Sequence, residues 1–300
     1  MYILFAAIAL IGSIGNTIFN RISSEKIGEI TSATIKSFMI TIACFFICVA
    51  FGHFNEIFMI NAKQFALIFL LGLVTVIDWL FYFLALKRSH LEAFAPFEAS
   101  AILFFSNLFF SIFMTESATK GGSFRNILLV SGGLIFIFAS MIYAVFNKKI
   151  NPKKKLFWVL FSLISSCAVS GTLVFATKIE STGIYSDVIA FYQMLFVFIV
   201  FTIMLLISKE KYVFKEIRPQ TYFNLSIAAI FNAIMIVFRY IALAFKNSNQ
   251  SVVNIVVGLD FVFVSIATVL FFKANNKKQL TILILLVITG MILNALPELL

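Results

Sequence analysis

The sequence predicts an all-α membrane protein of ten transmembrane helices, built as two inverted five-helix repeats. Three observations predict this class: the composition, the spacing of the apolar segments, and the recurrence of short motifs between the two halves. Hydrophobic residues make up 62% of the chain and charged residues 12%, whereas a soluble chain is nearer half apolar and a quarter charged. Lipid is therefore the expected solvent for most of this chain.

Ten apolar segments follow one another along the chain. Each is close to the length of about 20 residues that a helix needs to cross the hydrocarbon core. Open strands would leave backbone groups unpaired in lipid, and the segments lack the alternating polarity of barrel strands, so we expect helices. The first segment is read as a span and not as a signal peptide, because the first basic residue, Arg21, follows it. The ten segments are 2–20, 34–52, 64–86, 89–113, 124–146, 156–177, 187–208, 221–244, 248–272 and 279–297.

Short motifs recur between the two halves at a nearly constant offset. FYFLALKRSHLEAF at 81–94 resembles YIALAFKNSNQSVV at 240–253, and SGGLIFIF at 131–138 resembles TGMILNAL at 289–296. Gly15 and Phe19 likewise match Gly171 and Phe175. Five helices are an odd number, so a second copy enters the membrane upside down, as in many secondary transporters. We therefore expect a first repeat at 1–147, a basic linker at 148–155, and a second repeat at 156–300.

The basic residues predict the orientation. The loops after the odd-numbered segments carry 16 of the 23 Lys and Arg residues. Those after the even-numbered segments carry 5, when Arg125 at the start of the fifth segment is counted with them. Because cytoplasmic loops are enriched in Lys and Arg, the linker is expected in the cytoplasm and both termini outside, in a bacterial inner membrane. The same loops account for the net charge of +10. Because the basic residues form no stripe, nucleic-acid binding is not expected.

Several landmark residues stand at characteristic places in the two halves. They are Ala85-Leu86, Ser89, Pro96, Glu116, Gly132 and Lys36, with Ala242-Leu243, Ser248 and Gly290 in the second half. On these residues the whole chain resembles the EamA-like branch of the drug/metabolite transporter superfamily. One landmark differs, since Asn275 stands at the position that matches Glu116. The resemblance implies a ten-helix bundle around a central cavity, lined mainly by spans one, three, four, six, eight and nine. It also implies termini inside the cell, against the lysine count, and substrates such as amino acids, nucleotide sugars or drugs.

Charged residues deep within the apolar segments are the strongest functional candidates, because a charge costs at least about 2.5 kcal/mol at the centre of a membrane. Glu98, Asp260, Asp78 and Arg239 lie deep in their segments. They could serve substrate recognition or proton coupling, or they could form structural pairs, such as Arg239 with Asp260 and Lys36 with Asp78. Four further charges lie near segment ends and are interpreted as interfacial: Lys36, Glu92, Lys178 and Asp187.

Polar residues at helical spacing add further candidates, although such stripes also join helices to one another. Asn232 and Arg239 share one face, as do Asn16 and Asn20. Phe94 and Phe105, on the face of Glu98, could line an apolar part of a cavity. Two more stripes are Thr75, Asp78 and Tyr82, and Asn247, Gln250, Ser251, Asn254 and Gly258. The candidate substrate- or proton-binding residues are therefore Glu98, Asp260, Arg239, Asp78, Asn254, Asn232, Asn16 and Tyr82.

The function expected from these observations is secondary transport of a small polar or amphipathic metabolite such as an amino acid or organic ion. The family resemblance favours export, by alternating access. The alternative is a flippase for lipid-linked headgroups or a helper of envelope synthesis. An enzyme, a metal site and a cofactor are not expected, since the sequence lacks a nucleotide-binding G-x-x-x-x-G-K-[ST] and the H-E-x-x-H and G-x-S-x-G motifs. The expected partners are a small-molecule substrate and the lipid bilayer; proton coupling and a homodimer are left open.

Overall fold

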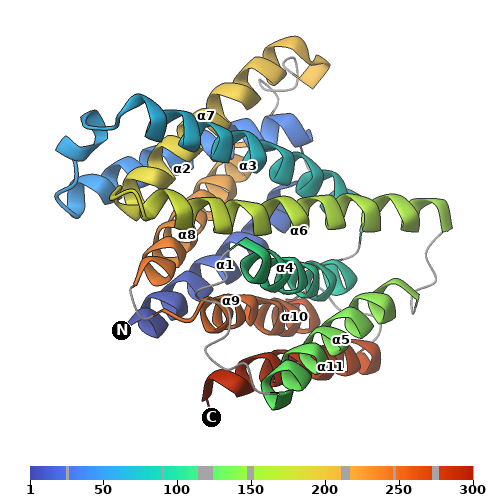
Figure 1. Ribbon diagram of the computed structural model, residues 1–300. Coiled ribbons are helices and arrows are strands. Elements are labelled where there is room, and N and C mark those ends of the chain that lie inside the picture. The colour runs from blue at the N-terminus through green and yellow to red at the C-terminus, as the bar shows by residue number, and fades with distance from the viewer. Residues whose placement is uncertain are drawn as a thin grey trace.

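Helices make up every regular element in the part of the chain that a computed structural model describes, which is residues 1–24, 27–89, 91–113, 124–146, 152–210, 217–245, 248–271 and 277–299. This confirms the predicted all-α class. The elements are α1 (Tyr2–Ser24), α2 (Glu29–Ala50), the 3-10 helix η1 (Asn55–Phe58), α3 (Ala62–Arg88), α4 (Leu91–Phe113), α5 (Phe124–Phe146), α6 (Pro152–Glu180), α7 (Ser186–Ile207), α8 (Pro219–Ala244), α9 (Gln250–Gly258), α10 (Asp260–Phe271) and α11 (Lys277–Leu299) (Figure 1).

The helices supply nine stretches that are long and apolar enough to cross a membrane, judged by length and composition within the described residues. Helix α4 adds a shorter apolar stretch, Phe94–Phe110. These stretches lie at the ten predicted spans, with α9 and α10 sharing the ninth. The chain is therefore a multi-pass integral membrane protein.

The ninth span departs from the prediction, which treated 248–272 as one uninterrupted helix. The α-helix is broken at Leu259, between α9 and α10. The N–H of Leu259 bonds the carbonyls of both Ile255 and Val256, and its own carbonyl accepts from Val262, three residues on. This local tightening toward 3-10 geometry makes Asp260 the first residue of a new helix.

The helix ends explain several boundaries. Pro152 is the first residue of α6, a position where proline is tolerated because its missing N–H would have no helical partner. The residues 152–155 of the predicted linker thus begin a helix, and 147–151 lie outside the described residues. Asn61 and Gln64 form a capping box that starts α3. The N-terminus of α2 is capped from the other half of the chain, because Glu210 accepts hydrogen bonds from the backbone and the hydroxyl of Thr31.

The most extensive helix contacts join the two halves of the chain. Helix α1 packs on α8, α3 on α6, α2 on α7 and α5 on α11, and Figure 1 shows α5 and α11 side by side at one edge of the bundle. In an inverted repeat, each of the first five spans is equivalent to the span five places later. Exchanging all equivalent spans turns the first pair into the second and leaves the other two pairs unchanged, so the set of four pairs stays the same. The pairing agrees with an inverted repeat, which remains our prediction.

Helices α5 and α11 cross where two glycines meet. A Cβ atom placed on Gly133 would lie 2.7 Å from the carbonyl oxygen of Gly290, and one placed on Gly290 would lie 3.0 Å from that of Gly133. Neither residue could carry a side chain without moving a backbone. Gly132, the landmark named by the family resemblance, does not occupy this crossing, since its nearest neighbour there is the side chain of Leu293 at 3.8 Å.

Candidate functional site

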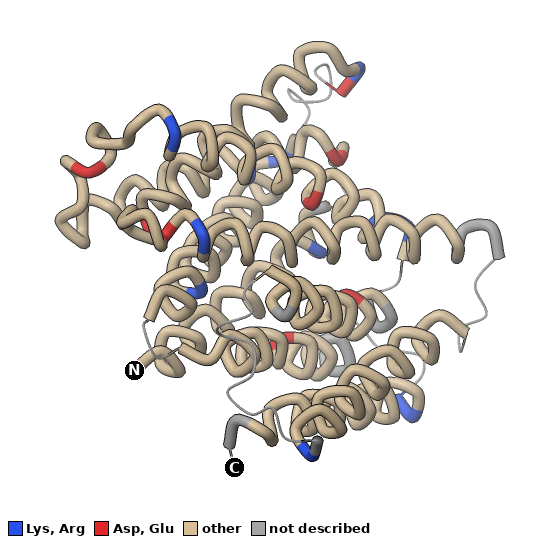
Figure 2. Tube along the Cα trace, in the orientation of Figure 1, with Lys and Arg blue, Asp and Glu red and all other residues tan. Residues whose placement is uncertain are grey.

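A cavity of about 140 Å³ lies within the bundle, with polar and charged side chains among its lining residues. Side chains from α1, α2, α3, α4, α6, α7, α8, α9 and α10 line it, and no described residue of α5 or α11 does. Figure 2 shows most charged residues near helix ends, with a few inside the bundle. The resemblance named six lining spans, and spans two and seven contribute as well. The eight candidate residues all line this one cavity: Asn16, Asp78, Tyr82, Glu98, Asn232, Arg239, Asn254 and Asp260.

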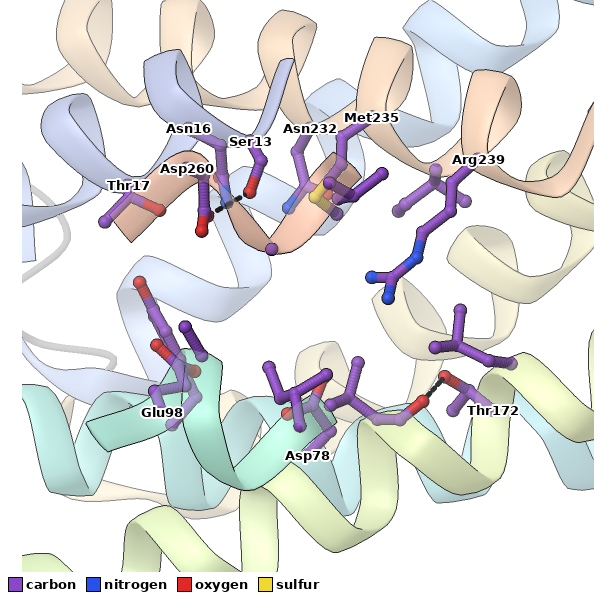
Figure 3. Close-up of a pocket in the computed structure, with 18 of the residues that line it drawn as sticks. Ser13, Asn16, Thr17, Asp78, Glu98, Thr172, Asn232, Met235, Arg239 and Asp260 are labelled. Atoms are coloured by element: carbon purple, nitrogen blue, oxygen red, sulfur yellow. Dashed lines mark hydrogen bonds between the residues drawn. The ribbon is translucent and has the colours of Figure 1, made fainter. Parts of the chain in front are cut away.

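Three carboxylates face the cavity, and they differ in their partners. Asp260 accepts a hydrogen bond from the hydroxyl of Ser13 at 2.5 Å, and Asp78 accepts one from Ser165 at 2.6 Å. Glu98 has no hydrogen-bond partner among the described residues, although Asp78, Asp260 and Lys36 are close enough to act on its charge. Figure 3 shows Asp260 on one side of the cavity and Glu98 and Asp78 on the other. Glu98 is therefore the carboxylate that is open to a proton or a ligand.

The guanidinium of Arg239 extends into the cavity from α8 (Figure 3). Its Nη2 atom donates to the Oδ1 atom of Asn254 at 3.0 Å. The Nε atom of Arg239, the Nδ2 atom of Asn254 and the Oδ1 atom of Asn232 are buried, and no partner among the described residues bonds them. Buried polar groups almost always have a hydrogen-bond partner. Arg239 and Asn254 therefore each keep a buried donor, and Asn232 keeps a buried acceptor, that a bound solute could satisfy.

Lys36 lies in this cavity and not at a membrane interface, so its interfacial interpretation is wrong. The helix that carries it begins at Glu29, five residues before the predicted segment, which places Lys36 two turns inside. The side chain is 2% exposed. Its Nζ atom donates to the Oδ1 atom of Asn16 at 2.7 Å and lies 4.8 Å from the ring centre of Trp79. A cation over an aromatic face in this way is held partly by the ring quadrupole.

The two expected structural pairs do not form. Arg239 and Asp260 do not come within 4.0 Å of each other as an ion pair, and neither do Lys36 and Asp78. Among the described residues, each of these four side chains forms its hydrogen bond with a neutral side chain. The charges are thus spread around the cavity instead of cancelling in pairs. This spacing leaves each of them able to interact with a bound solute.

Gln193 on α7 is a cavity residue that the sequence analysis did not select. Its side-chain amide donates to the hydroxyl of Thr75 at 2.7 Å, and its carbonyl accepts from the hydroxyl of Tyr240 at 2.8 Å. This chain of hydrogen bonds joins α3, α7 and α8. The repeat could have identified it, since Gln193 lies 157 positions after Lys36.

The two halves of the chain contribute the same helix positions to the cavity. The residues 156 positions after Ser13, Asn16 and Thr17 of α1 are lining residues of α6. Likewise, the residues 159 positions after four lining residues of α4 are lining residues of the ninth span. Adding 157 to Thr75, Asp78, Trp79, Tyr82 and Phe83 on α3 gives Asn232, Met235, Ile236, Arg239 and Tyr240 on α8. The offsets 156 and 159 are those of recurring motifs, and the offset of 157 between α3 and α8 differs by two from that of the motif at 81–94. The shared lining positions support the predicted repeat. The charges themselves are not repeated.

Several other candidates lie elsewhere. Phe94 and Phe105, which could have lined an apolar part of the cavity, are not among its lining residues. Phe94 packs behind the lining residue Tyr82, and Phe105 packs against Phe104. Asp187, expected at the interface, is buried outside this cavity, and both its carboxylate oxygens lie 3.0 Å from the Nδ1 atom of His53. Lys178 is exposed, as an interfacial residue would be. Glu116, Asn247 and Asn275 lie outside the described residues, as does the side chain of Glu92.

Fold and cavity together define a helical integral membrane protein with an ionisable chamber between its two halves. Residues 156–296 match the EamA-like transporter family. This match confirms the predicted resemblance over the second half of the chain. The members of this family are transporters and not enzymes.

Solved structures share the fold. Twenty-eight solved chains match. One of them, described only as "Crystal structure of protein", has a TM-score of 0.66 and 16% sequence identity, and the match covers 98% of this chain and 96% of the other. At this identity the likeness concerns the fold alone. Comparison with curated protein sequences found no match.

Proposed function

We propose that this protein is a secondary transporter that exports a small polar or amphipathic metabolite, such as an amino acid or another organic ion, by alternating access. One observation carries the proposal: five ionisable side chains from five helices face a single cavity inside the membrane. Ionisable groups within membranes are rare and typically mark substrate or ion pathways. Asp260 directly follows the tightened turn of the ninth span and faces the same cavity, which supports the same reading.

The side chains suggest a role for each end of the solute. Arg239 and Asn254 offer donors to a carboxylate or a phosphate group, and an arginine fork matches the geometry of both. Glu98 and Asp260 offer acceptors to an ammonium group or a proton. A solute with groups of both signs would satisfy both ends of this arrangement.

The balance of charge in the cavity favours coupling to a cation. Asp78, Glu98 and Asp260 supply three negative charges when ionised, and Lys36 and Arg239 supply two positive charges. A buried charge without compensation is costly. A proton or the cationic group of a substrate would balance this excess. Glu98 is its acceptor in our proposal, because none of the described residues forms a hydrogen bond with it.

A binding screen would identify the solute. The purified protein would be heated with amino acids, nucleotide sugars, polyamines and amphipathic cations at two pH values. A ligand that binds only the folded protein raises the melting temperature. We expect a rise with one chemical class, followed by uptake of the same compound into proteoliposomes.

Neutral variants test the roles of the carboxylates. Glu98→Gln and Asp260→Asn should abolish transport of the compound identified in the screen while leaving expression intact. Asp187→Asn is the matched control, since it neutralises a buried carboxylate outside the cavity, and it should retain transport. Normal transport by both cavity variants would overturn the assignment.

A further inference from the structure

The ammonium of Lys36 has fewer partners than it can bind. It carries three N–H donors, and Asn16 is its only hydrogen-bond acceptor among the described residues. The Oδ1 atom of Asn16 is held in place by a second donor, Asn20, at 3.1 Å. The ring of Trp79 covers another side of the ammonium. A donor direction therefore remains toward the cavity that Lys36 lines.

Lys36 and Arg239 approach the cavity from opposite membrane faces. Lys36 lies in the second turn of α2, near the end at which α2 enters the membrane. Arg239 lies in the last two turns of α8. Both helices begin on the side of the linker in a ten-span topology, so Lys36 is nearer the linker side and Arg239 is nearer the side of the termini. Asp78 and Glu98 act on Lys36 across the cavity without pairing with it.

The other half of the chain shows how this helix position looks without a charge. Gln193 is the equivalent residue at an offset of 157, and it uses both its donor and its acceptor on protein groups. Lys36 instead brings an incompletely bonded cation to the same place. The charge of Lys36 offsets part of the charge of Asp78 and Glu98, and its remaining donor direction points to a ligand.

We propose that Lys36 forms a second anion-binding site, at the linker-side end of the cavity, which holds the acidic group of the solute before it passes to Arg239. The ligand is a carboxylate or a phosphate group on a small solute. The role of this site in moving a solute rests on the proposed transport function. Anion binding at Lys36 can nevertheless be measured without transport.

Trp79 provides a direct probe of this site. The chain contains two tryptophans, and the other, Trp158, is fully buried against Phe97 outside the cavity. In a Trp158→Phe background, fluorescence quenching of the purified protein would be compared for iodide, caesium and neutral acrylamide. Acrylamide measures access to Trp79, and the excess of iodide over caesium measures attraction of an anion to the ammonium beside it.

We expect iodide to quench Trp79 more strongly than caesium does, and Lys36→Gln to abolish this preference without changing acrylamide quenching. Lys36→Arg, which keeps the charge, and Arg239→Gln, at the other end of the cavity, should retain it. An unchanged preference in Lys36→Gln would overturn the proposal. Loss in both Lys36→Gln and Arg239→Gln would also overturn it, because it would indicate one shared site.

A competition experiment on the protein with its native residue at position 36 keeps the test independent of the variants. Acetate and inorganic phosphate, added at constant ionic strength, should reduce iodide quenching, and the stronger competitor identifies a carboxylate or a phosphate as the preferred group. Failure of both to compete would overturn the assignment. If iodide preference is found but no solute is transported, the proposed function fails and the anion site remains.

Discussion

The hydroxyl of Ser13 donates a 2.5 Å hydrogen bond to the carboxylate of Asp260 and thereby joins the middle of α1 to the first residue of α10. Asp260 also follows directly on the break at Leu259. The bond therefore fixes α1 to the discontinuity in the ninth span, where negative charge near a helix N-terminus is favourable. A change of this contact would move both elements relative to each other.

A double-mutant cycle on Ser13 and Asp260 should show coupling. Ser13→Ala removes a donor from a buried carboxylate, so we expect it to lower the melting temperature of the purified protein. The same change should have little effect when Asp260 is already alanine, with a coupling energy of about 0.5–3 kcal/mol. Ser226→Ala, whose hydroxyl bonds only a carbonyl of its own helix, is the control. Additive effects of the two substitutions would contradict the contact.

The shape of the Arg239 side chain should matter as much as its charge. Lysine at this position keeps a positive charge but lacks the planar guanidinium fork. In Arg239 this fork donates to Asn254 with one nitrogen, while its Nε atom has no hydrogen-bond partner among the described residues. We expect Arg239→Lys to raise the KM for an acidic substrate about tenfold or more, since a hydrogen bond to a charged group contributes about 1.5–3 kcal/mol. Initial rates of uptake into proteoliposomes would measure this. Arg218→Lys, at the start of α8, is the control, and an equal KM in the two variants would refute the role of the fork.

Helical spacing in the sequence located much of the cavity. Asn232 and Arg239 are seven residues apart on one face of a helix, and both line the cavity. Depth was harder to judge, because the apolar run in the sequence begins later than the helix. Lys36 was therefore assigned to the interface, although α2 starts at Glu29 and carries it into the bundle.

The partners of the charges could not be predicted from one sequence. Asp78 bonds Ser165 and Asp260 bonds Ser13, and both serines are small residues in apolar runs that resemble ordinary helix-packing positions. Which serine reaches which carboxylate depends on how helices from opposite halves pack. The break at Leu259 was missed for a similar reason, since no proline marks it.

The glycine crossing of α5 and α11 should be sensitive to a single methyl group. In Gly133→Ala the new Cβ would meet backbone atoms of Gly290 and Asn294 within 2.8 Å, so the helices must separate. We expect a lower melting temperature. Gly132→Ala is the matched control on the neighbouring residue, where space is open. There the higher helix propensity of alanine, worth about 1 kcal/mol, should leave stability equal or slightly higher. Equal melting temperatures for the two variants would contradict the close crossing.

The orientation of the chain can be decided by cysteine labelling, because the lysine count and the family resemblance predict opposite answers. Ser181 follows α6 and Lys277 begins α11, and both residues are exposed. The three native cysteines lie within helices, and Cys44 and Cys48 are buried.

If the linker is cytoplasmic, a membrane-impermeant maleimide should label Ser181→Cys in right-side-out vesicles. Lys277→Cys should react only after the vesicles are permeabilised. This outcome follows from the excess of Lys and Arg on the linker side, and the unsubstituted protein measures background labelling. The reverse pattern would place both termini inside the cell, as the resemblance implies. Lys36 would then serve the external end of the cavity and Arg239 the cytoplasmic end.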